Sequence, residues 1–366
     1  MALKKTFIID HSKVKVLAKP KFGLSNRRFS IIYEYIESDR QAEIRVFEFS
    51  ILRLLLNKYD IIHVHWPDRV FASSGFRPLI KVLLLGLLFE FCKLRKTKII
   101  WTVHNPHIKF KHECGVKTED LYYRMLFKQV NHFIFPSSES QRTLEEKFRE
   151  QKLFLKPQSC SMIPLGIQEE LFAEGEARPQ DLPLEENGYF LIVGRITAEK
   201  NILETIESIK PVLRVLNRKL IVAGKCNDPS LIDSLMQNSD DYVYLLLRFL
   251  TDEEINYLIA KSFALLINYE VTNSGVATLA AAHKKAVFFS NENYAEGFAN
   301  DYDYSSSYSF EALLRDPGRL YAAVLEGVFA PRRSIGLSEV ARQYLNLFSI
   351  FSGSKVARNR DRKQRE

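Results

Sequence analysis

The stretch YFLIVGRITAEKNILETIESIKPVLRVLNRKLIVAGK, residues 189–225, contains one complete strand–helix–strand unit. Its two apolar runs, 189–193 and 219–223, are rich in Val, Ile and Leu, which is typical of buried strands. The segment 203–216 between them has the apolar spacing of a helix. A crossover helix of this kind joins two parallel strands, so the stretch predicts a parallel sheet covered by helices.

The same alternation of strand-like and helical segments runs through most of the chain. Strands are expected at 14–18, 44–49, 61–65, 98–103, 132–135, 159–163, 189–193, 219–223, 242–246, 264–267 and 286–289. Helices are expected at 28–37, 51–57, 79–94, 119–130, 138–150, 203–216, 231–237, 253–261 and 275–283. The polar stretch 174–188, EGEARPQDLPLEENG, separates two such series and has the composition of a boundary loop.

This organisation predicts an α/β protein of two facing, Rossmann-like, doubly wound domains with a ligand cleft between them. We place the domains at 1–172 and 173–336 and expect a helix at 337–349 to pack back on the first domain. The composition of the 366 residues, 46% hydrophobic and 26% charged, is that of a globular protein and excludes a disordered or collagen-like chain.

Two further features of the sequence predict a cytoplasmic location. The four cysteines form no CxxC pair, which is typical of reduced thiols, and residues 1–5 lead into only a short apolar stretch, unlike a signal peptide. The longest apolar run, 82–89, is far shorter than the ~20 residues that a membrane-spanning helix needs.

The net charge of +8 favours anionic partners, namely nucleotides, phospholipid surfaces or nucleic acids. The basic residues are not interleaved with aromatic ones, so nucleic acid is the least favoured partner. The C-terminal residues 353–366 are basic and without apolar periodicity, and we expect them to be disordered. Segment 79–94 is apolar with basic margins, which fits a peripheral contact with the inner leaflet of the cell membrane. The alternative is a helix that simply covers the sheet, since such helices are also largely apolar.

Histidines stand at the ends of two predicted strands, in IIHVHWPD (61–68) and IIWTVHNPH (99–107). His63 and His65 share one face of a strand, and they raise the hypothesis of a metal site with the residues that follow the next strand. These further residues are His104, His107, His112, Glu113 and Cys114. No zinc-binding spacing is present, and we expect no metal. Because strand ends face the ligand, His104 and Asp68 are candidates for proton transfer or substrate binding, the alternative being structural strand-end caps.

Two motifs of the second half place glycine and a cation where a strand ends. IVGRITAEKN (192–201) brings Gly194, Arg195 and Lys200 to the start of a helix, and AGK (223–225) adds Gly224 and Lys225. Such turns suit a diphosphate, because helix amides and cations both favour anions. Solvated lysines in ordinary turns are the alternative interpretation.

The segment NYEVTNSGVATLAAAH (268–283) passes from a strand through a polar turn into an alanine-rich helix. Thr272, Asn273 and Ser274 are candidates to cap this helix, and the amides near Gly275 are candidates to face a ligand. A cap without a ligand is the alternative. The serine is not a nucleophile elbow, because GxSxG is absent.

Taken together, HVHWPD, WTVHN, PLGI (164–167), VGRITAEKN, AGK and TNSG (272–275) resemble the GT-B glycosyltransferases of the family-4-like group. The resemblance covers residues 14–330 and is strongest to bacterial exopolysaccharide or capsule sugar transferases. It implies a hexosyltransferase that binds a UDP- or GDP-linked sugar on its C-terminal domain. The acceptor, a glycan or a polyprenyl-diphosphate-linked saccharide, would bind the N-terminal domain, and no metal or other cofactor would be needed.

The resemblance also implies roles for individual residues. Arg195 and Lys200 would hold the donor diphosphate during transfer, and His104 would contact the donor sugar. Ser137, with Ser138, matches a serine of the family that lines the cleft. The remaining implied substrate contacts are His65, Asn105, Gly194, Gly224, Lys225, Glu270, Thr272, Asn273, Ser274 and Gly275.

One motif of the family is incomplete. Glu270 lies near the first carboxylate of the E-x7-E motif, but the second position falls in 279–281, where the sequence is Leu-Ala-Ala. Two hypotheses therefore stay open, a divergent active transferase and a catalytically silent scaffold for a partner transferase. The stereochemical outcome also stays open. A retaining enzyme can use the donor phosphate, whereas an inverting enzyme needs a base, for which Asp68 is the candidate.

Overall fold

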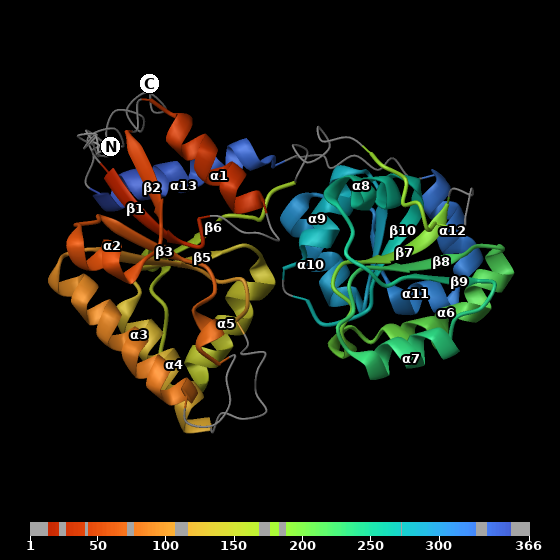
Figure 1. Cartoon of the computed structure of the whole chain (residues 1–366), viewed down its shortest axis with the longest axis horizontal. Helices are drawn as coiled ribbons and strands as arrows, with labels where there is room; N and C mark the ends of the chain where they lie inside the picture. The colour runs from red at the N-terminus through yellow and green to blue at the C-terminus, as the bar shows by residue number, and fades with distance from the viewer. Residues whose placement is uncertain are drawn as a thin grey trace, which may run out of the picture. The chain divides into compact units, whose positions relative to one another are not determined.

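The computed structural model describes residues 14–21, 27–40, 43–71, 77–106, 116–167, 176–182, 188–271, 273–326 and 335–352. The chain divides into two compact units. The first consists of Met1–Pro136, Ser140–Ile163 and Ser338–Glu366, and the second consists of Ser137–Glu139 and Pro164–Leu337. Each unit contains a six-stranded sheet, and each is described by itself (Figure 1).

The sheet of the first unit is parallel throughout. In spatial order its strands are β2 (Ile44–Glu48), β1 (Val14–Lys19), β3 (Ile61–Val64), β4 (Lys98–Thr102), β5 (His132–Phe135) and β6 (Cys160–Met162). Its helices are α1 (Arg28–Ser38), α2 (Ile51–Leu56), α3 (Arg77–Leu94), α4 (Val116–Gln129), α5 (Ser138–Glu150) and α13 (Leu337–Ser352).

Helices cover both faces of this sheet, which is why its central strands are buried along their whole length. Helices α2 to α5 pack on one face around an aromatic core that includes Trp101, Tyr122 and Phe148. Helices α1 and α13 lie on the other face (Figure 1), where Tyr344 of α13 approaches Thr102 of β4.

The second unit repeats the architecture with another parallel sheet. In spatial order its strands are β12 (Ser307–Ser309), β11 (Ala286–Phe289), β10 (Ser262–Ile267), β7 (Tyr189–Val193), β8 (Leu220–Ala223) and β9 (Val243–Leu246). Its helices are α6 (Ile202–Leu216), α7 (Pro229–Gln237), α8 (Asp252–Lys261), α9 (Gly275–Ala282), α10 (Glu292–Tyr302), α11 (Phe310–Arg315) and α12 (Pro317–Glu326).

Two apolar cores lie on the two faces of the second sheet, one beneath α8, α9 and α10 and the other beneath α6, α7 and α11. Local signals fix several helix starts. Thr251 and Glu254 form a capping box at α8, and the Ser274 side chain accepts a hydrogen bond from the Ala277 amide at α9.

The prediction of an α/β protein with two Rossmann-like domains is confirmed. In each sheet the strand order reverses direction at one point, between β1 and β3 in the first and between β7 and β10 in the second. In open parallel sheets, ligands bind outside the carboxyl ends of the strands at such a point. The segments that follow β3, β7 and β10 are therefore the places to look for a site.

The structure adds elements that the sequence did not indicate, namely α10, β12, α11 and α12. The units divide at Pro164, ahead of the polar stretch 174–188, and α13 begins where the first unit resumes. The tail 353–366 and, within the polar stretch, residues 174–175 and 183–187 lie outside the described residues. Within the described part of the chain, no helix combines the length and the apolar character that crossing a membrane requires.

Candidate active site

Three histidines of the first unit come together at the carboxyl ends of β3 and β4. His63 lies within β3, His65 directly follows it, and His104 lies just beyond β4. The parallel register, with Val64 opposite Trp101, brings the two strand ends side by side. His65 and His104 stack with ring centroids 5.2 Å apart.

A continuous chain of hydrogen bonds runs through these rings. The Tyr344 hydroxyl lies 3.1 Å from Thr102 Oγ1, which lies 2.8 Å from His63 Nε2. The Tyr33 hydroxyl, on α1, lies 2.8 Å from His63 Nδ1 and 2.7 Å from His65 Nε2. His65 Nδ1 lies 3.0 Å from His104 Nε2. Each buried ring nitrogen along this path thus has a partner, as buried polar groups require.

Burial keeps the three rings neutral. His63 is fully buried and His104 is 7% exposed, and desolvation lowers the pKa of each to about 3. Burial lowers the pKa of His65 well below its usual value, and competition for protons with the adjacent His63 and His104 lowers it further. Burial also raises the pKa of Tyr33 and raises the pKa of Tyr344 to about 12.

Neutrality couples the proton positions, because a neutral imidazole donates through one nitrogen and accepts through the other. The Tyr33 hydroxyl has one proton, so it donates to one histidine and accepts from the other. If it donates to His65 Nε2, the His65 proton lies on Nδ1 and is donated to His104 Nε2. If it donates to His63, His65 accepts from His104, and the His104 Nδ1 atom carries no proton. The tautomer of His104 is therefore coupled to Tyr33.

These lowered pKa values predict acid sensitivity of the first unit. The unfolded chain binds protons near pH 6.5 and the folded histidines only near pH 3, so the free energy of unfolding falls as the pH drops through this window. Between pH 7 and pH 5 each such histidine should cost about 2 kcal/mol. Urea titrations at both pH values should show a smaller loss for His63→Gln than for the natural chain. An equal loss in both proteins would contradict the assignment.

Asp68 lies in a short 3-10 turn, Pro67–Phe71, after the histidine strand. Its side chain is 5% exposed, and its Oδ2 atom lies 3.4 Å from Asn105 Nδ2, so two predicted site residues are neighbours. Its charge contributes to the raised pKa of Tyr122 and of Tyr123, for which burial is the larger cause. Asp68 is thus a nearly buried carboxyl group close to the strand ends.

In the second unit, two glycines meet where β7 and β8 end. Gly194 has φ +109° and Gly224 has φ +140°, conformations that side chains rarely adopt. The Gly194 amide donates to the Ala223 carbonyl at 3.0 Å. A Cβ atom on Gly224 would lie only 1.9 Å from the Gly194 oxygen. Glycine at 224 is therefore required by this contact.

Lys200 lies directly over the first of these glycines. A Cβ atom on Gly194 would be 3.4 Å from Lys200 Nζ and 3.8 Å from Val276 Cγ2, in the first turn of α9. The Lys200 ammonium also lies 5.3 Å from the centroid of the Tyr269 ring, in the loop after β10. A cation, a glycine turn and a helix N-terminus thus converge at the switch point between β7 and β10.

Arg195 and Lys225 are exposed beside this convergence, and backbone hydrogen bonds hold their two loops together. The Ile196 amide donates to the Lys225 carbonyl at 3.0 Å. The three cations that the sequence implicates, Arg195, Lys200 and Lys225, therefore follow the ends of the adjacent strands β7 and β8.

The loop from β10 into α9 contains the remaining predicted donor contacts. Ser274 caps α9, and its hydroxyl interacts with Tyr269, whose pKa is nevertheless raised by burial. Gly275 is the first residue of α9, and Glu270 is exposed in the loop. Thr272 lies outside the described residues.

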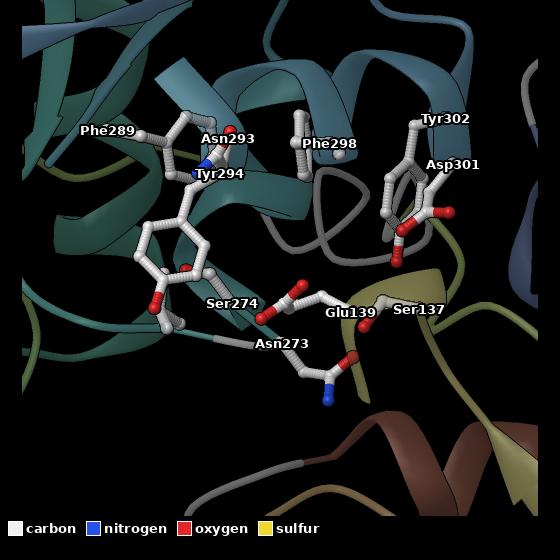
Figure 2. A pocket seen from close by; sticks show the side chains of 12 residues that line it. Ser137, Glu139, Asn273, Ser274, Phe289, Asn293, Tyr294, Phe298, Asp301 and Tyr302 are labelled. Carbon is white, nitrogen blue, oxygen red and sulfur yellow. The ribbon is translucent and has the colours of Figure 1, made fainter. Parts of the chain in front are cut away.

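A pocket of the second unit brings three predicted residues together. Ser137, Asn273 and Ser274 line it, together with aromatic residues of α10 such as Tyr294 and Phe298. Figure 2 shows these side chains around the opening, with Tyr302 and Asp301 at one end. The prediction that Ser137 lines a ligand site stays a prediction, as do the roles of the other site residues.

The positions where the family motif has its second carboxylate lie in the interior of α9. Ala280 and Ala281 are fully buried in the apolar core that covers this face of the sheet. An uncompensated carboxylate there would be strongly destabilising. The departure from the motif is therefore built into the packing of the second unit.

The metal hypothesis gains no support. Among the described residues, no group of three His, Cys, Asp or Glu side chains has an arrangement that could hold an ion. Four residues that entered this hypothesis lie outside the described part of the chain, namely His107, His112, Glu113 and Cys114.

Sequence reasoning missed the hydrogen-bond partners of the histidines. Tyr33 has the helical spacing of a core residue with Phe29 and Ile36, and Tyr344 is far away in the chain. The sequence did indicate that such partners exist, because His63 lies within the apolar strand IIHV and a buried imidazole needs hydrogen-bond partners.

No protein-family model matches the chain. A curated relative is the GDP-mannose:glycolipid 4-beta-D-mannosyltransferase of Xanthomonas campestris pv. campestris, which is 36% identical over 62 residues. The match covers 16% of this chain and 18% of that protein. It is a local similarity only.

Solved structures match over nearly the whole chain. The glycosyltransferase from Rickettsia africae ESF-5 has TM-score 0.56 and 12% identity and covers 93% of this chain and 99% of its own. AviGT4, a glycosyltransferase involved in avilamycin A biosynthesis, has TM-score 0.55 and 14% identity over 93% and 99%. Anabaena Alr3699/HepE in complex with UDP and glucose has TM-score 0.55 and 12% identity over 95% and 99%. The chain has the GT-B fold. It spans 59% of the matched chain of the GtfA/B complex, with TM-score 0.52.

Proposed function

We propose that this chain is a glycosyltransferase of the hexosyltransferase type that uses a UDP- or GDP-linked sugar. The acceptor is a glycan or a polyprenyl-diphosphate-linked saccharide in surface polysaccharide synthesis. One observation carries the proposal, the position of Lys200 Nζ over Gly194 and beside the first turn of α9. The names of the relatives, which include a GDP-mannose-dependent transferase and a UDP complex, support the class of donor.

The second unit would hold the nucleotide diphosphate. Gly194 and Gly224 keep side chains away from the strand ends, so phosphate oxygens can approach the backbone. Lys200 and the amides at the start of α9 favour negative charge there, and Arg195 and Lys225 add two further cations. We propose that these groups stabilise the departing nucleotide without a metal ion.

The first unit would bind the acceptor. In the transfer, the acceptor hydroxyl oxygen bonds to the anomeric carbon, and the bond from that carbon to the diphosphate breaks. The electron pair of the broken bond goes to the nucleoside diphosphate, and the hydroxyl proton goes to a base. A donor phosphate oxygen fills this role in a retaining reaction, and Asp68 is the candidate in an inverting one.

His104 would contact the donor sugar, with His65 and Asn105 beside it. Because its ring is neutral, His104 would contact the sugar as an uncharged imidazole. The coupling through His65 makes Tyr33 a positioning residue for this contact.

Replacing Tyr33 by phenylalanine should uncouple His104 from His63. We expect the ring ¹⁵N shifts of His65 and His104 to change and kcat to fall roughly tenfold, while the KM for the donor stays unchanged. The matched control is Tyr35→Phe, an exposed tyrosine on the same helix, which should leave all three quantities unaltered. Unchanged ¹⁵N shifts in Tyr33→Phe would refute the coupling.

The proposal is tested by incubating the protein with a panel of UDP- and GDP-sugars and a lipid-linked acceptor extract, followed by product mass measurement. A mass increase of one hexose with one donor is the expected result. Absence of a product with every donor, together with absence of nucleotide binding by calorimetry, would refute the proposal.

A catalytically silent scaffold is the second candidate function. The sequence Leu-Ala-Ala at 279–281, in place of a carboxylate, favours it, because the donor ribose would lose its usual acidic partner. The same panel separates the two candidates. A scaffold would bind a nucleotide sugar through Arg195 and Lys200 without turning it over.

A polyprenyl-linked acceptor would place the protein on the cytoplasmic side of the cell membrane, as a peripheral protein of the inner leaflet. We propose this location together with the function.

A further inference from the structure

Exposed aliphatic side chains are concentrated on two helices of the first unit. Among the described residues, twenty large hydrophobic side chains are exposed, and ten of them lie on α2 and α3. We call these ten residues the leucine face: Ile51, Leu52, Leu55, Leu56, Leu79, Ile80, Leu83, Leu84, Leu87 and Leu94. Elsewhere, exposed residues such as Val215, Met236 and Phe249 are scattered, as on ordinary surfaces.

Helix α3 is apolar on both sides. Val82, Phe89 and Cys92 pack into the core beneath the sheet. Ile80, Leu84 and Leu87 follow the spacing i, i+4, i+7 and lie on the opposite side, where they are 55%, 59% and 67% exposed. A covering helix can be largely apolar toward the sheet, but the side that faces solvent is typically polar. The outer side of α3 therefore needs a partner.

Helix α2 extends the same surface. The Arg95 guanidinium, just beyond α3, donates to the carbonyl oxygens of Leu54 and Leu55 at 2.6 and 3.1 Å. This contact fixes the end of α2 beside the end of α3, and Figure 1 shows the two helices as neighbours. Leu54 is buried, whereas the other aliphatic residues of α2 are exposed.

The charges of these segments identify the partner. Residues 51–58 and 77–98 contain eight Lys and Arg residues and one carboxylate, Glu90. A second copy of the chain on this surface would bring like charges together across a symmetric interface. An anionic lipid headgroup layer over an acyl region matches both the basic margin and the aliphatic face.

We propose that the leucine face docks the protein on an anionic lipid bilayer, with α2 and α3 lying in the interfacial plane. The proposal rests on the proposed function for its purpose, because a polyprenyl-linked acceptor lies in the same bilayer. The docking itself depends only on the surface described above. It makes α2 and α3 one membrane-binding element.

The test is sedimentation of the full chain with vesicles of phosphatidylcholine containing phosphatidylglycerol. The variant Leu84→Glu/Leu87→Glu should bind at least tenfold more weakly than the natural chain. The matched control is Val215→Glu/Met236→Glu, which adds the same charge at exposed aliphatic positions of the second unit and should bind normally. Equal thermal midpoints check that all variants are folded. Phosphatidylcholine alone should bind more weakly.

Three results would overturn the docking proposal. The first is failure of the natural chain to sediment with anionic vesicles. The second is normal vesicle binding by Leu84→Glu/Leu87→Glu. The third is a dimer in solution that this variant dissociates, with no vesicle binding by the natural chain.

Activity assays distinguish docking from transfer. Vesicle binding through the leucine face without turnover of any acceptor refutes the transferase alone, and turnover of a water-soluble acceptor without vesicle binding refutes docking alone.

Discussion

Replacing Lys200 by alanine is expected to lower kcat for sugar transfer by roughly 100- to 1,000-fold, the range measured when one preorganised charge-stabilising donor is removed. The proposed role is specific. As the bond to the anomeric carbon breaks, negative charge grows on the nucleotide diphosphate, and the ammonium over Gly194 would stabilise it. This ammonium lies over the Tyr269 ring, 5.3 Å from its centroid.

The loss should appear mainly in kcat, because Arg195, Lys225 and the α9 amides would still bind the ground-state diphosphate. Initial rates over a range of donor concentrations measure both constants. The matched control is Arg319→Ala, which removes an exposed cation from α12 of the same unit and should leave both constants unchanged. Wild-type turnover in a folded Lys200→Ala protein would exclude Lys200 from the reaction.

Replacing Gly224 by alanine is expected to destabilise the second unit by about 3 kcal/mol or more. The new Cβ would lie 1.9 Å from the Gly194 oxygen and 2.7 Å from the Gly194 carbonyl carbon. Both are backbone atoms of Gly194, whose amide donates to the Ala223 carbonyl just beyond the β7–β8 pairing, so they cannot move aside without disturbing that hydrogen bond. The φ of +140° adds strain of its own.

Gly297→Ala is the matched control for this substitution. Gly297 lies within α10, and a Cβ there would meet nothing within 4 Å. Alanine should be neutral or stabilise the helix by up to about 1 kcal/mol. Urea unfolding of the two variants measures the difference. Equal unfolding midpoints for the two variants would show that the Gly194 backbone can shift to accept a Cβ atom at position 224, contrary to this prediction.

Much of the fold could be predicted because each βα unit carries its own local signals. The apolar run of β7, the amphipathic α6 and the apolar run of β8 follow one another within 189–223, and each is legible without the rest of the chain. The region after β11 was not predicted. Helix α10 and the short strand β12 have mixed polar and aromatic sequences, and their contact with each other decides their structure.

The candidate site was predictable only in part, for a related reason. Gly194, Arg195 and Lys200 stand close together in the sequence at a strand end, so the anion hypothesis needed no tertiary information. The position of Val276 and Tyr269 around Lys200 depends on β10 lying beside β7, which are far apart in the chain. The local spacing of apolar residues does not reveal which strands, far apart in the chain, lie side by side in the sheet.

By itself, the sequence determined the alternation of strands and helices, the glycines and cations at strand ends, and the excess of positive charge, because propensity, apolar period and composition are local properties. Only the tertiary structure decided which groups meet. It joined Tyr33, Thr102 and Tyr344 to the histidines, because buried nitrogens must find partners wherever the chain packing supplies them. It also decided which side of α3 is exposed. Aliphatic residues lie on more than one side of this helix, so the sequence alone could not tell which of them pack against the sheet and which face outward.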